Sequence, residues 1–239
     1  MNVLLDIIII IFVILGTYAG ARKGLLKTLV GLIGLVAIVI ISCSLRIPVA
    51  NFLIDKMPFL NFSGTIEGLT SLNILIYNII AFIIIFGVLY AILNIILALT
   101  GIIDTLLKFT VIWVIPSKIG GALLGFLEAW VFVFLVLFIF VQFSFSSTFI
   151  TNSKAANVVL DNTPLVGNYL KGAKNAAINI YDTIEEYSKN EIKDIKKMNS
   201  DILNIEIDNG LITKEKVNKL IANGKLKIDE SSGKELEND

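Results

Sequence analysis

The sequence predicts an all-α integral membrane protein with four transmembrane helices and a C-terminal tail that is helical and partly disordered. Hydrophobic residues make up 56% of the 239 residues, and the mean hydropathy is +0.83, above the apolar share of an ordinary soluble domain. Charges are segregated, because the first 153 residues hold only seven of the 20 Lys and Arg and five of the 20 Asp and Glu. We therefore expect a membrane domain over residues 1–150 and a polar tail over residues 151–239.

Four long apolar segments cover residues 3–21, 25–45, 74–99 and 119–145. A helix needs about 20 mostly apolar residues to cross about 30 Å of hydrocarbon, and each segment reaches that length within its usual spread. Lipid offers no hydrogen-bond partners to the backbone, so each span must be a helix.

The first segment has one feature of a cleaved signal peptide, the small residues Ala19-Gly20-Ala21. Its charges are opposite to those of a signal peptide, since Asp6 stands before the apolar core and Arg22 and Lys23 follow it. We therefore expect the segment to be a retained span.

The short loops indicate the orientation, because Lys and Arg favour the cytoplasmic side. Five basic residues flank the first and third loops, against two in the longer second loop and none at the N-terminus: Arg22, Lys23, Lys27, Lys108 and Lys118, against Arg46 and Lys56. Arg22, Lys23 and Lys27 are expected to be topology anchors at anionic headgroups. Four spans then place both termini outside the cell.

Two spans carry small residues at every fourth position: Gly16, Gly20 and Gly24 in the first, and Ser117, Gly121, Gly125 and Ala129 in the fourth. Such stripes let helix backbones approach closely, which drives association in lipid. Packing within one chain is the simpler interpretation, and homo-oligomerisation is the alternative.

Glu128 is the leading candidate for a functional residue. It lies nine residues beyond Ile119, which is about 13–14 Å into the span and close to mid-bilayer. A carboxylate there costs about 3 kcal/mol and usually faces a helix bundle or a water path. We expect it to be protonated, or paired with Asn78, Asn94 or a basic side chain. It is either part of an ion path or a polar contact between helices.

Asp6 is the second candidate for a functional residue inside the membrane. A carboxylate in the first turn of a helix is favoured by the helix dipole, so a capping role is the simpler interpretation. Asp6 lies near an interface and Glu128 near the midplane, so we do not expect the two carboxylates to meet.

The composition excludes several chemistries. Histidine is absent and Cys43 is the single cysteine, so a Cys/His metal site and a Ser-His-Asp triad are excluded. Neither nucleotide-binding glycine signature occurs, and the balanced charge does not favour nucleic acid. We expect no catalytic, cofactor-binding or metal-binding residues, with the lipid bilayer and other membrane proteins or further copies of the chain as partners.

Outside the spans we expect three helical segments. Residues 47–57, with Pro48 near the first turn, have the pattern of a short amphipathic helix, and apolar residues recur with helical spacing over 164–198. Thr213 can cap a short helix over 213–223 that Asn223-Gly224 would end. The charged end from Asp229 is expected to be disordered.

Several motifs together resemble the colicin V production protein (CvpA) family of bacterial inner-membrane proteins. The first is Asp6 followed by Gly20-Ala21-Arg22-Lys23-Gly24-Leu25-Leu26-Lys27 and an apolar span. The others are Gly120-Gly121-Ala122-Leu123-Leu124-Gly125-Phe126-Leu127 and Ser153-Lys154-Ala155-Ala156 before Pro164. The resemblance covers about residues 1 to 170, with Thr28 and Glu128-Ala129 departing from the usual family pattern.

The resemblance implies a non-enzymatic role in producing or exporting a peptide toxin, or another envelope function exerted through partners. The alternative is a small oligomeric channel or transporter with Glu128 facing the pathway. An ion flux after reconstitution that changes in Glu128→Gln would distinguish the two.

Overall fold

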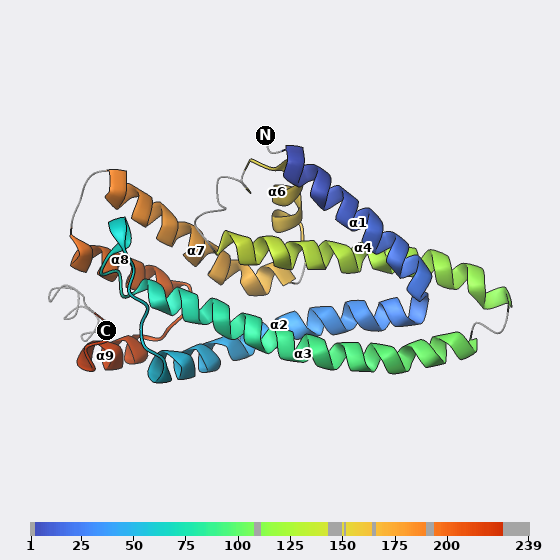
Figure 1. Ribbon diagram of the computed structural model, residues 1–239, viewed down its shortest axis with the longest axis horizontal. Coiled ribbons are helices and arrows are strands. Elements are labelled where there is room, and N and C mark those ends of the chain that lie inside the picture. Colours follow the sequence, from blue (N-terminus) through green and yellow to red (C-terminus); the bar gives the residue numbers. More distant parts are fainter. Residues whose placement is uncertain are drawn as a thin grey trace. The chain divides into compact units, whose positions relative to one another are not determined.

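The computed structural model describes residues 3–107, 111–142, 150, 152–163, 166–189 and 194–226, and the regular elements in these ranges are helices (Figure 1). In order they are α1 (Val3–Lys23), α2 (Leu25–Lys56), the short 3-10 helix η1 (Gly64–Ile66), α3 (Leu72–Leu107), α4 (Val111–Val141), α6 (Lys154–Asp161), α7 (Val166–Lys189), α8 (Ile195–Asp208) and α9 (Lys214–Ala222).

Four of these helices are long and apolar enough to cross a membrane, and they coincide with the four expected spans. The qualifying stretches are Val3–Lys23, Leu25–Lys56, Leu72–Ala98 and Pro116–Val141. The all-helical, four-span fold class is therefore confirmed. Residues 143–145 of the expected fourth span lie outside the described residues.

The separate amphipathic helix expected over residues 47–57 was a wrong prediction. Instead α2 continues to Lys56 with Pro48 inside it. A proline in a helix loses one backbone hydrogen bond and crowds the preceding turn. Ala50 and Ile54 beyond it are fully buried, so packing of this last part of α2 outweighs that local cost.

The chain divides into two compact units. Unit 1 comprises Met1–Ser44 and Ile84–Tyr169, and unit 2 comprises Leu45–Ile83 and Leu170–Asp239. The division expected near residue 150 stays a prediction. Within unit 1, α1 crosses α4 and packs against it, and α6 contacts both helices (Figure 1).

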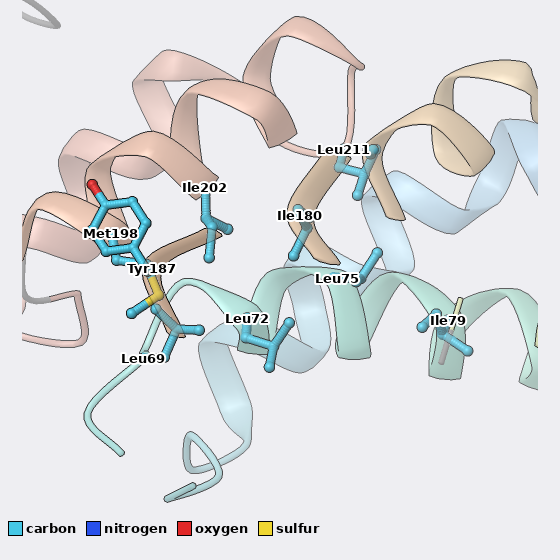
Figure 2. Packing of buried hydrophobic residues seen from close by; sticks show 10 residues of the cluster. Leu69, Leu72, Leu75, Ile79, Ile180, Tyr187, Met198, Ile202 and Leu211 are labelled. Atoms are coloured by element: carbon cyan, nitrogen blue, oxygen red, sulfur yellow. The ribbon is translucent and has the colours of Figure 1, made fainter. Parts of the chain in front are cut away.

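Unit 2 combines two parts of the chain. The first is the connection between α2 and α3 with the adjoining helix ends, and the second is α7 from Leu170 onward with α8 and α9. Its first apolar cluster brings the start of α3 against α7 and α8, as Figure 2 shows for Leu72, Leu75, Ile180 and Ile202. A second cluster adds α2 and α9, through the buried residues Ile54, Ile74, Tyr77, Leu203, Ile212, Val217, Leu220 and Leu226. These clusters give the tail a folded core that it shares with the second loop.

Polar contacts fix the same arrangement at three points of unit 2. The amide oxygen of Asn199 on α8 accepts hydrogen bonds from the backbone N–H and the hydroxyl of Ser71, both at 2.9 Å. Lys225 Nζ donates to the Ile54 carbonyl at 2.6 Å, near the C-terminus of α2. Lys216 Nζ lies 2.5 Å from Asp55 Oδ1. The second loop and the tail therefore lie on one side of any membrane the spans cross.

The tail contains two helices over the region where one was expected from 164 to 198. α7 ends at Lys189, and α8 begins after Asp194, whose side chain accepts from the Lys197 N–H. α9 begins after Thr213, whose hydroxyl accepts from the Lys216 N–H. The expected disordered end from Asp229 lies outside the described residues, as do residues 164, 165 and 190–193.

Candidate functional site

The contact between α1 and α4 consists of small residues on both sides. A Cβ on Gly20 would lie 2.6 Å from the Gly125 Cα, and a Cβ on Gly125 would lie 2.7 Å from the Gly16 carbonyl oxygen. A Cβ on Gly121 would lie 2.5 Å from the Gly20 carbonyl oxygen. Real Cβ atoms do not approach that closely, so this helix pair requires glycine at these positions. The two stripes face each other within one chain.

Gly24 has a different role from the other glycines of its stripe. It connects α1 to α2 with a φ of 85°, a backbone conformation that residues with a Cβ rarely adopt. Its N–H donates to the Gly20 carbonyl, and its own carbonyl accepts from the Thr28 N–H and hydroxyl. The tight turn directs the first residues of α2 back along the α1–α4 pair.

Glu128 faces the end of α1. Its Oε2 lies 3.3 Å and its Oε1 3.4 Å from Lys23 Nζ, and the side chains of Lys23 and Glu128 are 38% and 21% exposed. Gly31 on α2 leaves room for the carboxylate, since a Cβ there would lie 3.0 Å from Glu128 Oε1. Among the partners expected for Glu128, the structure shows a basic residue.

The depth of Glu128 follows from the register of the two helices. Gly125 and Ala129, on either side of Glu128, lie against Gly16, which is seven residues before the end of α1 at Lys23. Glu128 therefore lies about two turns from that end of α1. Along α4 it lies at the middle of the membrane-spanning stretch Pro116–Val141, and the expected mid-bilayer depth stays a prediction.

The ion pair lies on a cavity of about 400 Å³ within unit 1. Helices α1 to α4 all contribute to its wall, through Phe12, Gly16, Ala19, Lys23, Lys27, Gly31, Leu35, Tyr90, Leu93, Asn94, Leu97, Ala98, Gly125, Glu128, Ala129 and Phe132. The rings of Phe12 and Phe132 stack with centroids 5.6 Å apart. Lys23 and Lys27 lie beside the α1–α2 turn, whereas the Phe12 and Phe132 rings lie nearer the start of α1. The cavity is therefore polar at one end and apolar at the other.

The three expected topology anchors differ in their surroundings. Arg22 is exposed, with its guanidinium 5.9 Å from the centre of the Tyr18 ring. Lys23 and Lys27 line the cavity, and the anchoring role of all three residues stays a prediction. Lys23 lies three residues after Gly20 and seven after Gly16, so it is on the face of α1 that contacts α4.

Asp6, in the first turn of α1, contacts the start of α6. Its Oδ1 accepts from the Ser153 hydroxyl at 2.5 Å and from the Ala155 N–H at 2.9 Å. The carboxylate thus lies at the N-terminus of α6, where the helix dipole favours a negative charge. The far end of α6 is held by the Trp130 ring N–H, which donates to the Thr163 hydroxyl at 3.0 Å. These contacts place the start of α1 beside the chain that follows α4.

Glu206 on α8 was missed by the sequence reasoning. Its side chain is fully buried in unit 2, and neither carboxyl oxygen has a hydrogen bond of good geometry to a described residue. Burial raises the pKa of the Glu206 carboxyl well above its ordinary value, although the nearby Leu75 N–H opposes the shift. The available signal was its spacing, since Ile202 and Leu203 precede it by four and three residues on the apolar face of α8.

The described residues offer little for metal binding. No three Cys, Asp or Glu side chains among them come close enough to hold a metal ion. Histidine does not occur in the sequence.

Comparison with known proteins assigns the chain to a family. The family model of the colicin V production protein matches residues 5–164, a range that contains α1 from Leu5 onward, α2 to α4, the cavity and α6. The chain belongs to the colicin V production protein family. One relative is an uncharacterized transmembrane protein, YshB, of Bacillus subtilis (strain 168), which is 28% identical over 179 residues, 70% of this chain and 96% of the relative. No solved structure matches the chain.

The family match covers some of the features described above but not others. The glycine contact, the Lys23–Glu128 pair and the Asp6–α6 contact all lie inside the matched range, whereas α8, α9 and Glu206 lie beyond it. As a member of the colicin V production protein family, the chain is a multi-pass membrane protein. Its apolar helices contact the lipid bilayer.

Proposed function

We propose that this protein is a non-enzymatic component of the bacterial inner membrane that supports production or export of a peptide toxin, or a related envelope process, through other membrane proteins. The observation that carries the proposal is the family match, because it includes all four spans and the chain that follows them. Both termini and the tail are outside in this proposal, following the basic residues of the first and third loops.

The arrangement of Glu128 favours a structural role over a conducting one. A carboxylate that faces an ammonium group 3.3 Å away is neutralised by the protein itself, so it needs no mobile ion in the path. The apolar end of the cavity, with its stacked Phe12 and Phe132 rings, also opposes a continuous polar path. These observations support the partner-dependent function over the channel alternative.

The small-residue stripes support the view that partners bind elsewhere. Gly16, Gly20, Gly121 and Gly125 contact one another within one chain, so those faces are occupied before any partner arrives. A second copy or a different membrane protein would need another surface, such as the exposed apolar sides of the spans or unit 2.

The test of the function is complementation. A colicin V-producing bacterium that lacks its own family protein is given this chain, and toxin activity is measured in the culture supernatant. The proposal predicts that secreted toxin returns, and that it returns equally with Glu128→Gln once membrane levels are matched. Absence of secreted toxin despite normal membrane levels would contradict the toxin role.

A second experiment separates the channel alternative. The full chain is purified, reconstituted into liposomes and assayed for proton and potassium flux beside empty liposomes. The proposal predicts equal flux in both. A flux that depends on the protein and changes in Glu128→Gln would replace the proposal with the channel.

A further inference from the structure

We propose that the cavity of unit 1 binds one anionic phospholipid from the surrounding bilayer, with its phosphate at Lys27 and one acyl chain along the apolar wall. This inference goes beyond the proposed function and does not depend on it. It rests on the charge, the shape and the opening of the cavity.

The charge of the cavity is net positive. Three ionisable side chains line it, namely Lys23, Lys27 and Glu128, together with the phenol of Tyr90. Lys23 and Glu128 neutralise each other at 3.3 Å. Within the described residues Lys27 has neither a hydrogen bond nor an ion pair. One unpaired ammonium group therefore remains in a mostly apolar cavity, where an anion would stabilise it.

The shape of the cavity matches an amphiphile. Lys23 lies at the end of α1, and Phe12 lies eleven residues earlier on the same helix, which is about 16 Å along its axis. On α2, Leu35 lies eight residues beyond Lys27, or about 12 Å. The basic end would hold a phosphate, and the wall between these residues would hold a chain. The volume of about 400 Å³ is within the range of about 300–1,000 Å³ usual for ligand sites.

The opening of the cavity lies on an apolar face of the spans. Asn94 and Ala98 of α3 line the cavity and are also exposed. Their neighbours Ile92 and Ile95 are 49% and 65% exposed, as expected for side chains that contact lipid. A ligand that enters here comes from the bilayer, which favours a membrane lipid over a water-soluble anion. Basic pockets between transmembrane helices bind anionic headgroups in the same way.

The experiment measures retained lipid on the full chain. The protein is reconstituted in equimolar phosphatidylglycerol and phosphatidylcholine, released in mild detergent and analysed by native mass spectrometry. We expect one retained phosphatidylglycerol per chain, and about fivefold less of it in Lys27→Gln, the factor expected when one lysine is removed from an anionic headgroup. Lys118→Gln is the matched control, because Lys118 is exposed and does not line the cavity.

A second pair of variants tests the position without changing charge. Ala98→Phe narrows the opening and should lower retention, whereas Ile92→Phe on the same helix should not. Lys27→Arg should retain the lipid, which separates loss of charge from loss of fold. Equal retention of the two lipids, wild-type retention in Lys27→Gln, or equal retention in Ala98→Phe and Ile92→Phe would each overturn the proposal.

Discussion

Lys23 Nζ lies 3.3 Å from Glu128 Oε2, across the contact between the last turns of α1 and the middle of α4. Three glycines make this pair possible. Gly20 and Gly125 let the two helices touch, and Gly31 leaves space for the carboxylate. The pair therefore belongs to the packing of the helices, and it lowers the cost of holding a carboxylate among apolar spans.

Removing one partner of this pair should destabilise unit 1. Glu128→Ala leaves the Lys23 ammonium beside an apolar helix face, so we expect a lower melting temperature in detergent. A double-mutant cycle with Lys23→Ala should give a coupling energy of about 1 kcal/mol, in the range found for polar contacts between membrane helices. The charge-exchanged double variant, Lys23→Glu with Glu128→Lys, should recover much of the loss. Additive effects of the two alanine variants would show that the residues do not interact.

The α1–α4 contact predicts a large difference between two glycines. Gly121→Val places a side chain where the first added atom would lie 2.5 Å from the Gly20 carbonyl oxygen, whereas a Cβ on Gly87 would meet nothing within 4 Å. Steric overlap of backbone cannot be relieved by a rotamer change, so we expect Gly121→Val to lose several kcal/mol or fail to assemble.

The matched control for that contact is Gly87→Val. Both variants replace a helical glycine with the same β-branched residue, so differences in helix propensity cancel. The fraction of each protein that elutes as a single species in gel filtration, with its thermal stability, gives the result. Equal behaviour of the two variants would contradict the observed helix contact.

Asp6 should hold α6 in place. Its Oδ1 accepts two hydrogen bonds at the start of that helix, so Asp6→Ala should loosen α6 by about 1 kcal/mol, the usual value of a capping interaction. Hydrogen exchange of α6 amides should accelerate roughly fivefold at that energy. Asp6→Asn keeps an acceptor oxygen without the charge, so its effect should be smaller. Unchanged exchange in Asp6→Ala would mean that the contact contributes nothing.

Glu206 should make unit 2 more stable in acid than in base. Its pKa in the folded protein is raised well above the ordinary 4.5, so folding favours the protonated form. The stability that this group contributes is complete below pH 4.5 and is lost as the pH rises toward the folded pKa. Glu206→Gln removes the titration and should slow hydrogen exchange of α8 at neutral pH relative to wild type. Near pH 4 the two proteins should exchange alike.

Comparison at a single pH cancels the intrinsic pH dependence of exchange, so the difference reports on Glu206 itself. Glu215→Gln is a suitable control, because Glu215 is exposed and pairs with Lys219 at 2.6 Å. The opposite sign, with faster exchange in Glu206→Gln at neutral pH, would show that the carboxylate is ionised and stabilised in the fold.

The sequence predicts the parts of this fold that depend on one helix at a time. Hydropathy over about 20 residues locates each span, and the spacing of Gly16 and Gly20 shows that a close helix contact exists. The identity of the helix that packs against this face of α1 can be known only from the tertiary structure. The match between the α1 and α4 stripes is clear only after the register of the two helices is known.

Three features depend on contacts between distant segments and could not be predicted locally. Pro48 is a helix-breaking signal, but α2 continues because Ile54 is buried among side chains from α3, α8 and α9. Lys23 has the pattern of a topology anchor, but the packing of α1 against α4 places it beside Glu128. Glu206 is a polar residue on an apolar helix face, and its environment is formed by α3, more than 100 residues earlier.

The contact between Asp55 and Lys216, 2.5 Å apart in unit 2, gives the most direct test of the four-span account. In a Cys43→Ala background, single cysteines replace Asp55, Lys216 or Lys118, and intact cells are treated with a membrane-impermeant maleimide. We expect labelling at positions 55 and 216 from outside the cell, and labelling at position 118 only after the membrane is opened. Labelling of positions 55 and 216 from opposite sides would contradict the four-span account.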